Sequence, residues 1–78
     1  RAIRVDPDYA LAYNNRGFTY DELEKYEEAI ADYTRAIRVD PDYALAYNNR
    51  GVAHADLGNY KDAIADYTRA IKINSDYP

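Results

Sequence analysis

The chain has 78 residues, a formal net charge of −4, no cysteine and a single histidine. This length allows one small domain, and the acidic balance argues against a nucleic-acid-binding protein, which usually carries a basic patch. No apolar run reaches the roughly 20 residues that a membrane-spanning helix needs, and the N-terminus resembles no signal peptide. The lack of cysteine excludes disulfides and is compatible with a cytoplasmic location, which we expect.

The sequence repeats itself with a period of 34 residues, which predicts a repeat architecture. The segment Ala10–Tyr43 recurs at Ala44–Tyr77 with 21 of 34 positions identical, and the first nine residues recur verbatim at Arg35–Tyr43. We therefore expect one domain (1–78) made of the remnant of a preceding unit (1–9), repeat 1 (10–43) and repeat 2 (44–77). Because the chain opens inside a unit, we interpret it as a piece of a longer protein; an engineered or recently duplicated repeat is the alternative.

The first stretch of repeat 1 has the pattern of an amphipathic helix. Residues 1–6 read as the last turns of an earlier helix, which Pro7 cannot continue. Asp8 suits the N-cap of the next helix, which is predicted from Tyr9 to about Leu23. Its apolar positions recur at spacings of three and four: Ala10, Tyr13, Gly17, Tyr20 and Leu23. The glycine in the middle of this face indicates the close approach of a neighbouring helix.

A break between two helices is expected at Glu24–Lys25, whose counterparts in repeat 2 are Gly58–Asn59. Glycine suits the left-handed conformation that often ends a helix, so Glu24 would hold the same backbone at a cost of roughly 1 kcal/mol. The second helix is predicted from about Glu27 to Val39. Its apolar stripe comprises Ala29, Ile30, Tyr33, Ala36 and Ile37. No segment alternates with period two, so the sequence predicts an all-α stack of antiparallel helical hairpins.

These residues resemble the tetratricopeptide repeat. The matching positions are Tyr13, Gly17, Tyr20, Ala29, Tyr33, Ala36 and Pro41 in repeat 1, and Tyr47, Gly51, Ala63, Tyr67 and Ala70 in repeat 2. Four features depart from the family pattern: tyrosine opens the motif in place of tryptophan, Arg16 and Arg50 replace leucine, His54 replaces the second tyrosine, and Ser75 replaces the closing proline. The resemblance implies an α-solenoid of helix-turn-helix hairpins with right-handed superhelical stacking.

The resemblance also implies that the first helix of each hairpin lines a concave groove that holds an extended peptide. By register, the groove positions are Leu11, Asn14, Asn15, Phe18, Asp21 and Glu22, followed by Leu45, Asn48, Asn49, Val52, Ala55 and Asp56. Asparagine amides can donate to and accept from a peptide backbone, and Asn15 and Asn49 are the leading candidates; the alternative is that some asparagines bond neighbouring helices or water. The family's clamp for acidic chaperone tails uses Lys and Arg, which these positions lack, so we expect a neutral-to-basic peptide.

Charged residues outside this groove are predicted to be structural. Arg16 and Arg50 should pair with Asp32 and Asp66 on the antiparallel helix, rather than contact a ligand. Cations of the second helices should complement helix C-termini and pair with acids of adjacent units, or else attract an acidic partner: Arg1, Arg4, Arg35, Arg38, Arg69 and Lys72. Acids crowd the first hairpin turn without the glycine of a calcium loop, and a solvated edge is expected there: Asp21, Glu22, Glu24, Glu27 and Glu28.

The sequence offers no chemistry for an enzyme, because one histidine without cysteine supports neither a zinc site nor a nucleophile with its base. We expect a protein–protein interaction module without cofactor, membrane or nucleic-acid partner, which binds an extended peptide or a partner helix. The alternative is structural self-association. Repeat arrays usually need about three repeats and polar caps, and the last hairpin is expected to leave Tyr67, Ala70 and Ile71 partly uncovered. Copies would then stack end to end or exchange helices.

Overall fold

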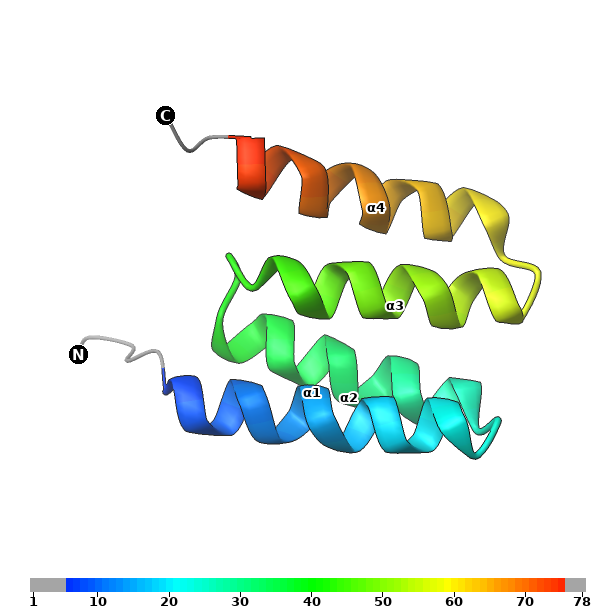
Figure 1. Ribbon diagram of the computed structural model, residues 1–78, viewed down its shortest axis with the longest axis horizontal. Coiled ribbons are helices and arrows are strands. Elements are labelled where there is room, and N and C mark those ends of the chain that lie inside the picture. The colour runs from blue at the N-terminus through cyan, green and yellow to red at the C-terminus, as the bar shows by residue number, and fades with distance from the viewer. Residues whose placement is uncertain (1–5, 76–78) are drawn as a thin grey trace.

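The computed structural model describes residues 6–75, which form four α-helices: α1 (Pro7–Glu22), α2 (Tyr26–Val39), α3 (Ala44–Asp56) and α4 (Tyr60–Ser75). α1 and α2 form one antiparallel hairpin, α3 and α4 form a second, and α3 packs on α2 so that the hairpins stack (Figure 1). The described residues contain no strand. The predicted all-α solenoid of helical hairpins is therefore confirmed.

The start of α1 differs from the prediction. Asp6 is the N-cap residue: its backbone is extended, with φ −111° and ψ 99°, and its Oδ1 accepts a hydrogen bond of 3.1 Å from the backbone N–H of Asp8. Pro7 stands in the first turn, where the missing N–H removes no intrahelical bond. Asp8 lies two residues after the cap, inside the first turn, and places its charge near the positive end of the helix. The predicted Asp8 cap was wrong because Pro7 begins this helix.

The structure describes only part of the two ends of the chain. Residues 1–5, where the end of a preceding helix is predicted, lie outside the described residues, as do residues 76–78. Within the described part, α4 continues through Ser75, whereas α2 stops at Val39. The counterpart of Ser75 is Pro41, which lies in the turn after α2. Serine in place of proline lets the backbone hydrogen bonds of α4 continue to this position.

Both hairpin loops reverse at a residue in the left-handed region, as predicted. Glu24 has a φ of 63° and its counterpart Gly58 has a φ of 82°. The same turn is thus built on glutamate in one repeat and on glycine in the other. α1 ends just before this turn, so Leu23 follows the helix and is 62% exposed. The prediction that Leu23 closes the buried face of this helix was therefore wrong.

The substitution Gly58→Ala should lower the free energy of unfolding by about 1 kcal/mol, because an L-residue is strained at a positive φ. A Cβ at this position would meet no atom within 4 Å, so crowding adds nothing to the loss. Glu24→Gly is the matched substitution in repeat 1 and should not destabilise the chain. Urea denaturation followed by circular dichroism measures both variants. A Gly58→Ala variant as stable as the wild type would contradict the strain argument.

The core combines small residues with one fully buried tyrosine. Its members with the lowest exposure are Ala10, Ala29, Tyr33, Ala36, Ala46, Ala53 and Ala63. The ring of Tyr33 fills the space beside Gly17: a Cβ added at the glycine would lie 2.8 Å from Tyr33 Cε1. Gly51 and Tyr67 repeat this contact in the second hairpin, at 2.7 Å. The close approach that the mid-helix glycine predicts is therefore made by the tyrosine of the antiparallel helix.

Candidate functional site

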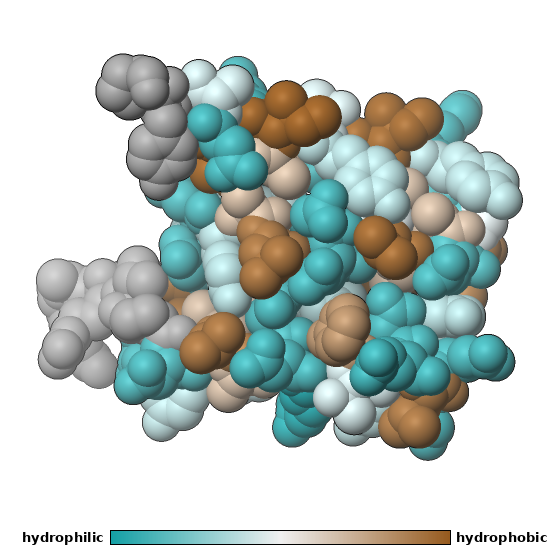
Figure 2. Space-filling view, viewed as in Figure 1, coloured by the Kyte–Doolittle hydropathy of each residue, from teal (hydrophilic) through white to brown (hydrophobic). Residues whose placement is uncertain are grey.

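Large apolar side chains remain exposed along α1 and α3. Leu11 and Phe18 of α1 are 49% and 50% exposed, and Leu45 and Val52 of α3 are 50% and 38% exposed. Figure 2 shows separate hydrophobic patches over these two helices, with hydrophilic surface between them. Two asparagines that the sequence places in the groove are exposed beside the patches. Together these residues are the α1/α3 surface: Leu11, Asn15, Phe18, Leu45, Asn48 and Val52.

The other two predicted groove asparagines bond to each other. Asn49 Nδ2 donates a hydrogen bond of 3.1 Å to Asn14 Oδ1, which links α3 to α1. Asn14 is only 3% exposed, and Asn49 is partly buried. An amide buried without a partner would cost free energy, so this bond satisfies part of both side chains and fixes the register of the two hairpins. Of the four predicted groove asparagines, Asn15 and Asn48 are therefore exposed on the surface, whereas Asn14 and Asn49 bond to each other between α1 and α3.

The predicted groove acids lie where α1 and α3 end. Glu22 and Asp56 are exposed, and Asp21 is partly buried. Burial raises the pKa of the Asp21 carboxyl, and the charges of Asp56 and Glu22 raise it further. Burial, Asp56 and nearby acids likewise raise the pKa of the Tyr26 hydroxyl. Negative charge is therefore concentrated at this end of the α1/α3 surface. Ala55, the remaining predicted groove residue of α3, is partly buried.

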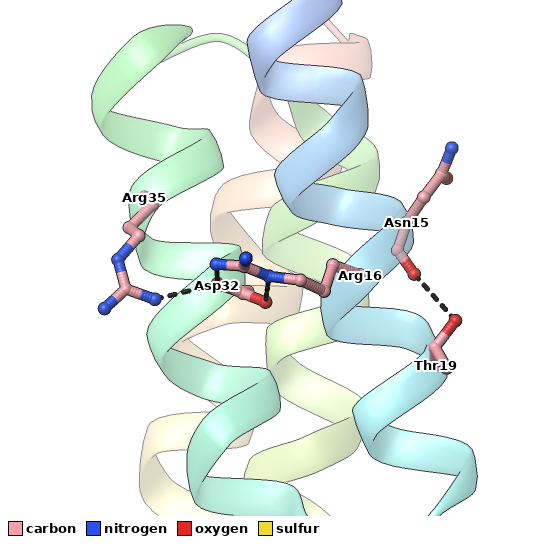
Figure 3. A network of polar contacts seen from close by, with 5 residues as sticks. All are labelled: Asn15, Arg16, Thr19, Asp32 and Arg35. Carbon is pink, nitrogen blue, oxygen red and sulfur yellow. Dashed lines mark hydrogen bonds and ion pairs between the residues drawn. The ribbon is translucent and has the colours of Figure 1, made fainter.

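The predicted pair between Arg16 and Asp32 is confirmed, and it includes a third residue (Figure 3). Arg16 donates from Nε and Nη2 to the two carboxylate oxygens of Asp32, at 2.7 and 2.8 Å. Arg35, one turn further along α2, donates to Asp32 Oδ1 at 2.7 Å. The hydrogen bond from Arg16 is the main cause that lowers the pKa of Asp32, burial opposes it, and Arg35 adds to the lowering. The part of Arg35 in this network was not predicted, although its i+3 spacing from Asp32 on one helix is the signal.

The side chain of Asn15 points away from this network. Figure 3 shows it directed off α1, on the side opposite to the ion pair, while its backbone oxygen accepts a hydrogen bond of 3.2 Å from the Thr19 hydroxyl. The Asn15 amide is therefore presented to solvent next to a structural ion pair that holds α1 on α2. Asn15 and Arg16 are neighbours in the sequence, but the Asn15 side chain faces solvent whereas the Arg16 side chain pairs with Asp32.

Repeat 2 contains the same predicted pair with an additional bond to repeat 1. Arg50 donates from Nε and Nη2 to Asp66, both at 2.8 Å, and its Nη1 donates to the Thr34 hydroxyl at 3.2 Å. His54 Nε2 lies 3.8 Å from the Asp66 carboxylate. The side chain of Arg50 is 21% exposed, against 56% for Arg16. Arg50 is more buried because it lies where the hairpins meet, and its bond to Thr34 was not predicted.

Within residues 6–75, the second-helix cations form no ion pair with acids of the adjacent unit. All ion pairs among the described residues lie within one hairpin. Arg35 pairs with Asp32 of its own helix, and the guanidinium of Arg69 lies 5.9 Å from the ring centroid of Tyr47. That prediction was therefore wrong for the described residues, which do not include Arg1 and Arg4. Arg38 and Lys72 stand in the last turns of α2 and α4, which is the place predicted for cations that complement helix C-termini.

The described residues offer no inorganic site. They contain no group of three or more His, Cys, Asp or Glu side chains that could hold a metal ion. None of the helices in the range 6–75 is both long and apolar enough to cross a membrane.

Two family profiles, each described as tetratricopeptide repeat, match residues 19–78 and residues 1–31. The chain belongs to the tetratricopeptide repeat family. Repeats of this family are generally non-catalytic and serve protein interaction. Among the residues that carry the resemblance, Ala29, Ala36 and Ala63 are buried, and the ring of Tyr33 lies against Gly17.

Solved structures of tetratricopeptide repeats share this fold. The first TPR of Spaghetti (RPAP3), bound to the HSP90 peptide SRMEEVD, is 33% identical with a TM-score of 0.90, and the match covers 97% of this chain and 60% of that one. The second TPR of Spaghetti, bound to the same peptide, is 37% identical with a TM-score of 0.80, covering 87% and 59%. MamA is 28% identical with a TM-score of 0.84, covering 87% and 40%. The chain thus spans about 60% or less of the length of these proteins.

Proposed function

We propose that the chain is a protein-interaction module that binds an extended segment of a partner protein on the α1/α3 surface. The observation that carries this proposal is the row of half-exposed apolar side chains on two neighbouring helices, with exposed amides between them. An asparagine amide supplies a donor and an acceptor to a peptide backbone without reading its side chains. The apolar side chains supply contact area for the side chains of the bound segment. The two Spaghetti domains, which share the fold, bind a peptide.

The charge of this surface favours a neutral-to-basic peptide. None of the twelve groove positions predicted from the register is lysine or arginine, whereas Asp21, Glu22 and Asp56 are acidic. The peptide bound to the Spaghetti domains, SRMEEVD, carries acidic residues toward its end. An acidic tail of this kind would meet like charge at the end of α1 and α3. We therefore expect this chain to bind a different class of peptide from those two relatives.

A peptide array with matched sequences tests the proposal. The array holds extended peptides with one apolar frame and either Lys/Arg or Asp/Glu at the flanks, together with SRMEEVD. Basic peptides should bind at least about tenfold more tightly than their acidic counterparts, and added salt should reduce the difference. Phe18→Ala and Leu45→Ala should each weaken binding, while Glu28→Ala on the exposed side of α2 should not. Preference for SRMEEVD, or unchanged binding by both groove variants, would contradict the proposal.

A second candidate function is association between copies of the chain. It uses the face of α3 and α4 that points away from repeat 1, where Ile64 and Ile71 are 63% and 67% exposed.

A further inference from the structure

The contact between the two hairpins shows how α3 covers repeat 1. α3 packs on α2 and touches α1, and Tyr33 of repeat 1 forms one buried cluster with Ala29 and with Ala53 of α3. α3 contributes Ala46 and Ala53, which are both completely buried. Because the repeats share most of their sequence, this contact is a template for whatever covers repeat 2.

The corresponding face of repeat 2 is open in the described structure. Ile71 and Ile64 are 67% and 63% exposed, while their counterparts Ile37 and Ile30 are partly buried under α3. Figure 2 shows hydrophobic patches along the edge formed by α4. A cleft of about 540 Å³ runs between α3 and α4 and is lined by Ala44, Leu45, Asn48, Tyr67, Ala70, Ile71 and Asn74. We call this the end cleft. Of the residues predicted to be uncovered here, Ile71 is exposed and Tyr67 partly buried, but Ala70 is only 7% exposed.

The opposite end of the stack presents the matching helix. α1 and α4 lie at opposite ends in Figure 1. α1 contains the same ALAYNNRG segment as α3. Its Ala12 and Thr19 are exposed, although their counterparts Ala46 and Ala53 in α3 are completely buried. α1 therefore exposes the side that α3 uses to cover repeat 1.

The polar groups of the two ends are complementary as well. Between the hairpins, Asn49 donates to Asn14, and Arg50 donates to Thr34. At the ends of the stack, the counterpart donors belong to Asn15 and Arg16 on α1, and the counterpart acceptors to Asn48 and Thr68 on α3 and α4. Asn15, Asn48 and Thr68 are exposed, and the Arg16 side chain is 56% exposed.

Two substitutions between the repeats compensate in size across this contact. Tyr20 packs against the cluster of Ala29, Tyr33 and Ala53. If α1 of a second copy of the chain stood on repeat 2 as α3 stands on repeat 1, Thr19 of that copy would take the place of Ala53, and His54 of repeat 2 would take the place of Tyr20. Threonine is larger than alanine, and histidine is smaller than tyrosine. A gain in volume on one side thus meets a loss on the other, which close packing requires.

We infer that α1 of a second copy of this chain docks in the end cleft, in the register that α3 adopts on repeat 1. Asn15 of the docked copy then donates to Asn48, and Arg16 donates to Thr68. The donor and acceptor faces differ, so the contact is head-to-tail and each dimer retains one free face of each kind. The end cleft shares Leu45 and Asn48 with the α1/α3 surface, so a docked copy and a bound peptide compete for these two residues.

The association is weak because the second copy is not tethered. α3 is held on repeat 1 by the chain itself, whereas a second copy loses translational and rotational freedom on binding. Pro7 of the docked copy and Ser75 of the first correspond to the same position of the repeat, so the α3 register requires a local adjustment where α1 begins and α4 ends, which weakens the association further. We therefore expect association at roughly micromolar to millimolar concentrations, as is usual for small interfaces.

Sedimentation velocity with the 78-residue chain tests the inference. The weight-average mass of the wild type should rise past that of a dimer as the concentration increases toward about 1 mM. Ile71→Glu blocks the end cleft, and Ala12→Glu blocks the docking side of α1; both residues are exposed, so folding is retained and is checked by circular dichroism. Each variant alone should remain monomeric.

An equimolar mixture of the two variants gives the decisive result. Ile71→Glu retains a free α1 and Ala12→Glu retains a free end cleft, so the mixture should form one-to-one heterodimers and nothing larger. Leu11→Glu is the matched control, because Leu11 and Leu45 are about equally exposed whether or not a repeat stacks on them, at 49% and 50%. It should associate like the wild type. A wild type that is monomeric at about 1 mM, or a mixture that stays monomeric, would overturn the inference.

Discussion

Asp32→Ala should lower the free energy of unfolding by about 3 kcal/mol, the low end of what removing one partner of a buried ion pair costs. Asp32 is completely buried and accepts three hydrogen bonds from two arginines on two helices. Its loss leaves a small void and removes the tie between α1 and α2. The effect stays at the low end because Arg16 and Arg35 are about half exposed and can return to water.

Denaturation at several pH values separates the charge from the packing. The pKa of Asp32 is lowered in the folded chain, so its ion pair stabilises the fold above the ordinary aspartate pKa of about 3.9 and this stabilisation is lost as the pH falls through the folded-state pKa. The difference in stability between wild type and Asp32→Ala should therefore narrow below about pH 4. Asp32→Asn retains the volume and should recover only part of the loss at neutral pH. A loss near zero, or a gap that does not change with pH, would contradict the assigned role.

Most of the fold follows from local signals in the sequence. The apolar spacings and the glycine at position 58 are properties of short segments, and they predict the helices and the hairpin turns. The 34-residue period adds that the second hairpin repeats the first. The N-cap was misassigned because aspartate stands on both sides of Pro7. Either can cap a helix, and only the backbone of Asp6 shows which one does.

The candidate site is less predictable because it depends on what stacks against each helix. Asn14 and Asn48 occupy the same position of the repeat, yet Asn14 is buried against α3 and Asn48 is exposed. Arg16 and Arg50 differ in exposure for the same reason. Identical residues at equivalent positions of the two repeats thus differ in role according to their place in the stack. A period in the sequence specifies the contact, but the number of neighbouring repeats decides which side chains remain available.

Gly17→Ala should lower the free energy of unfolding by about 2 kcal/mol. Comparison with the same substitution in repeat 2 measures how the cover of a neighbouring repeat confines the side chains beneath it. Alanine is a better helix former than glycine by about 1 kcal/mol, so helix propensity alone predicts stabilisation. However, the new Cβ would lie 2.8 Å from Tyr33 Cε1 and 3.2 Å from the backbone oxygen of Ala29. Tyr33 is completely buried and cannot withdraw, so overpacking costs about 3 kcal/mol and outweighs the propensity gain.

Gly51→Ala provides the matched control. Its Cβ meets Tyr67 Cε1 at 2.7 Å and Ala63 O at 3.2 Å, which is the same local crowding. Tyr67 borders the end cleft and is only partly buried, so its ring can move outward. We expect this variant to differ from the wild type by less than about 1 kcal/mol, because the propensity gain offsets most of the cost. Urea denaturation at low protein concentration, where copies stay apart, compares the two variants. If Gly51→Ala lost as much stability as Gly17→Ala, the cover provided by α3 would not be what confines Tyr33, and the contrast between the internal and open faces of the repeat would fail.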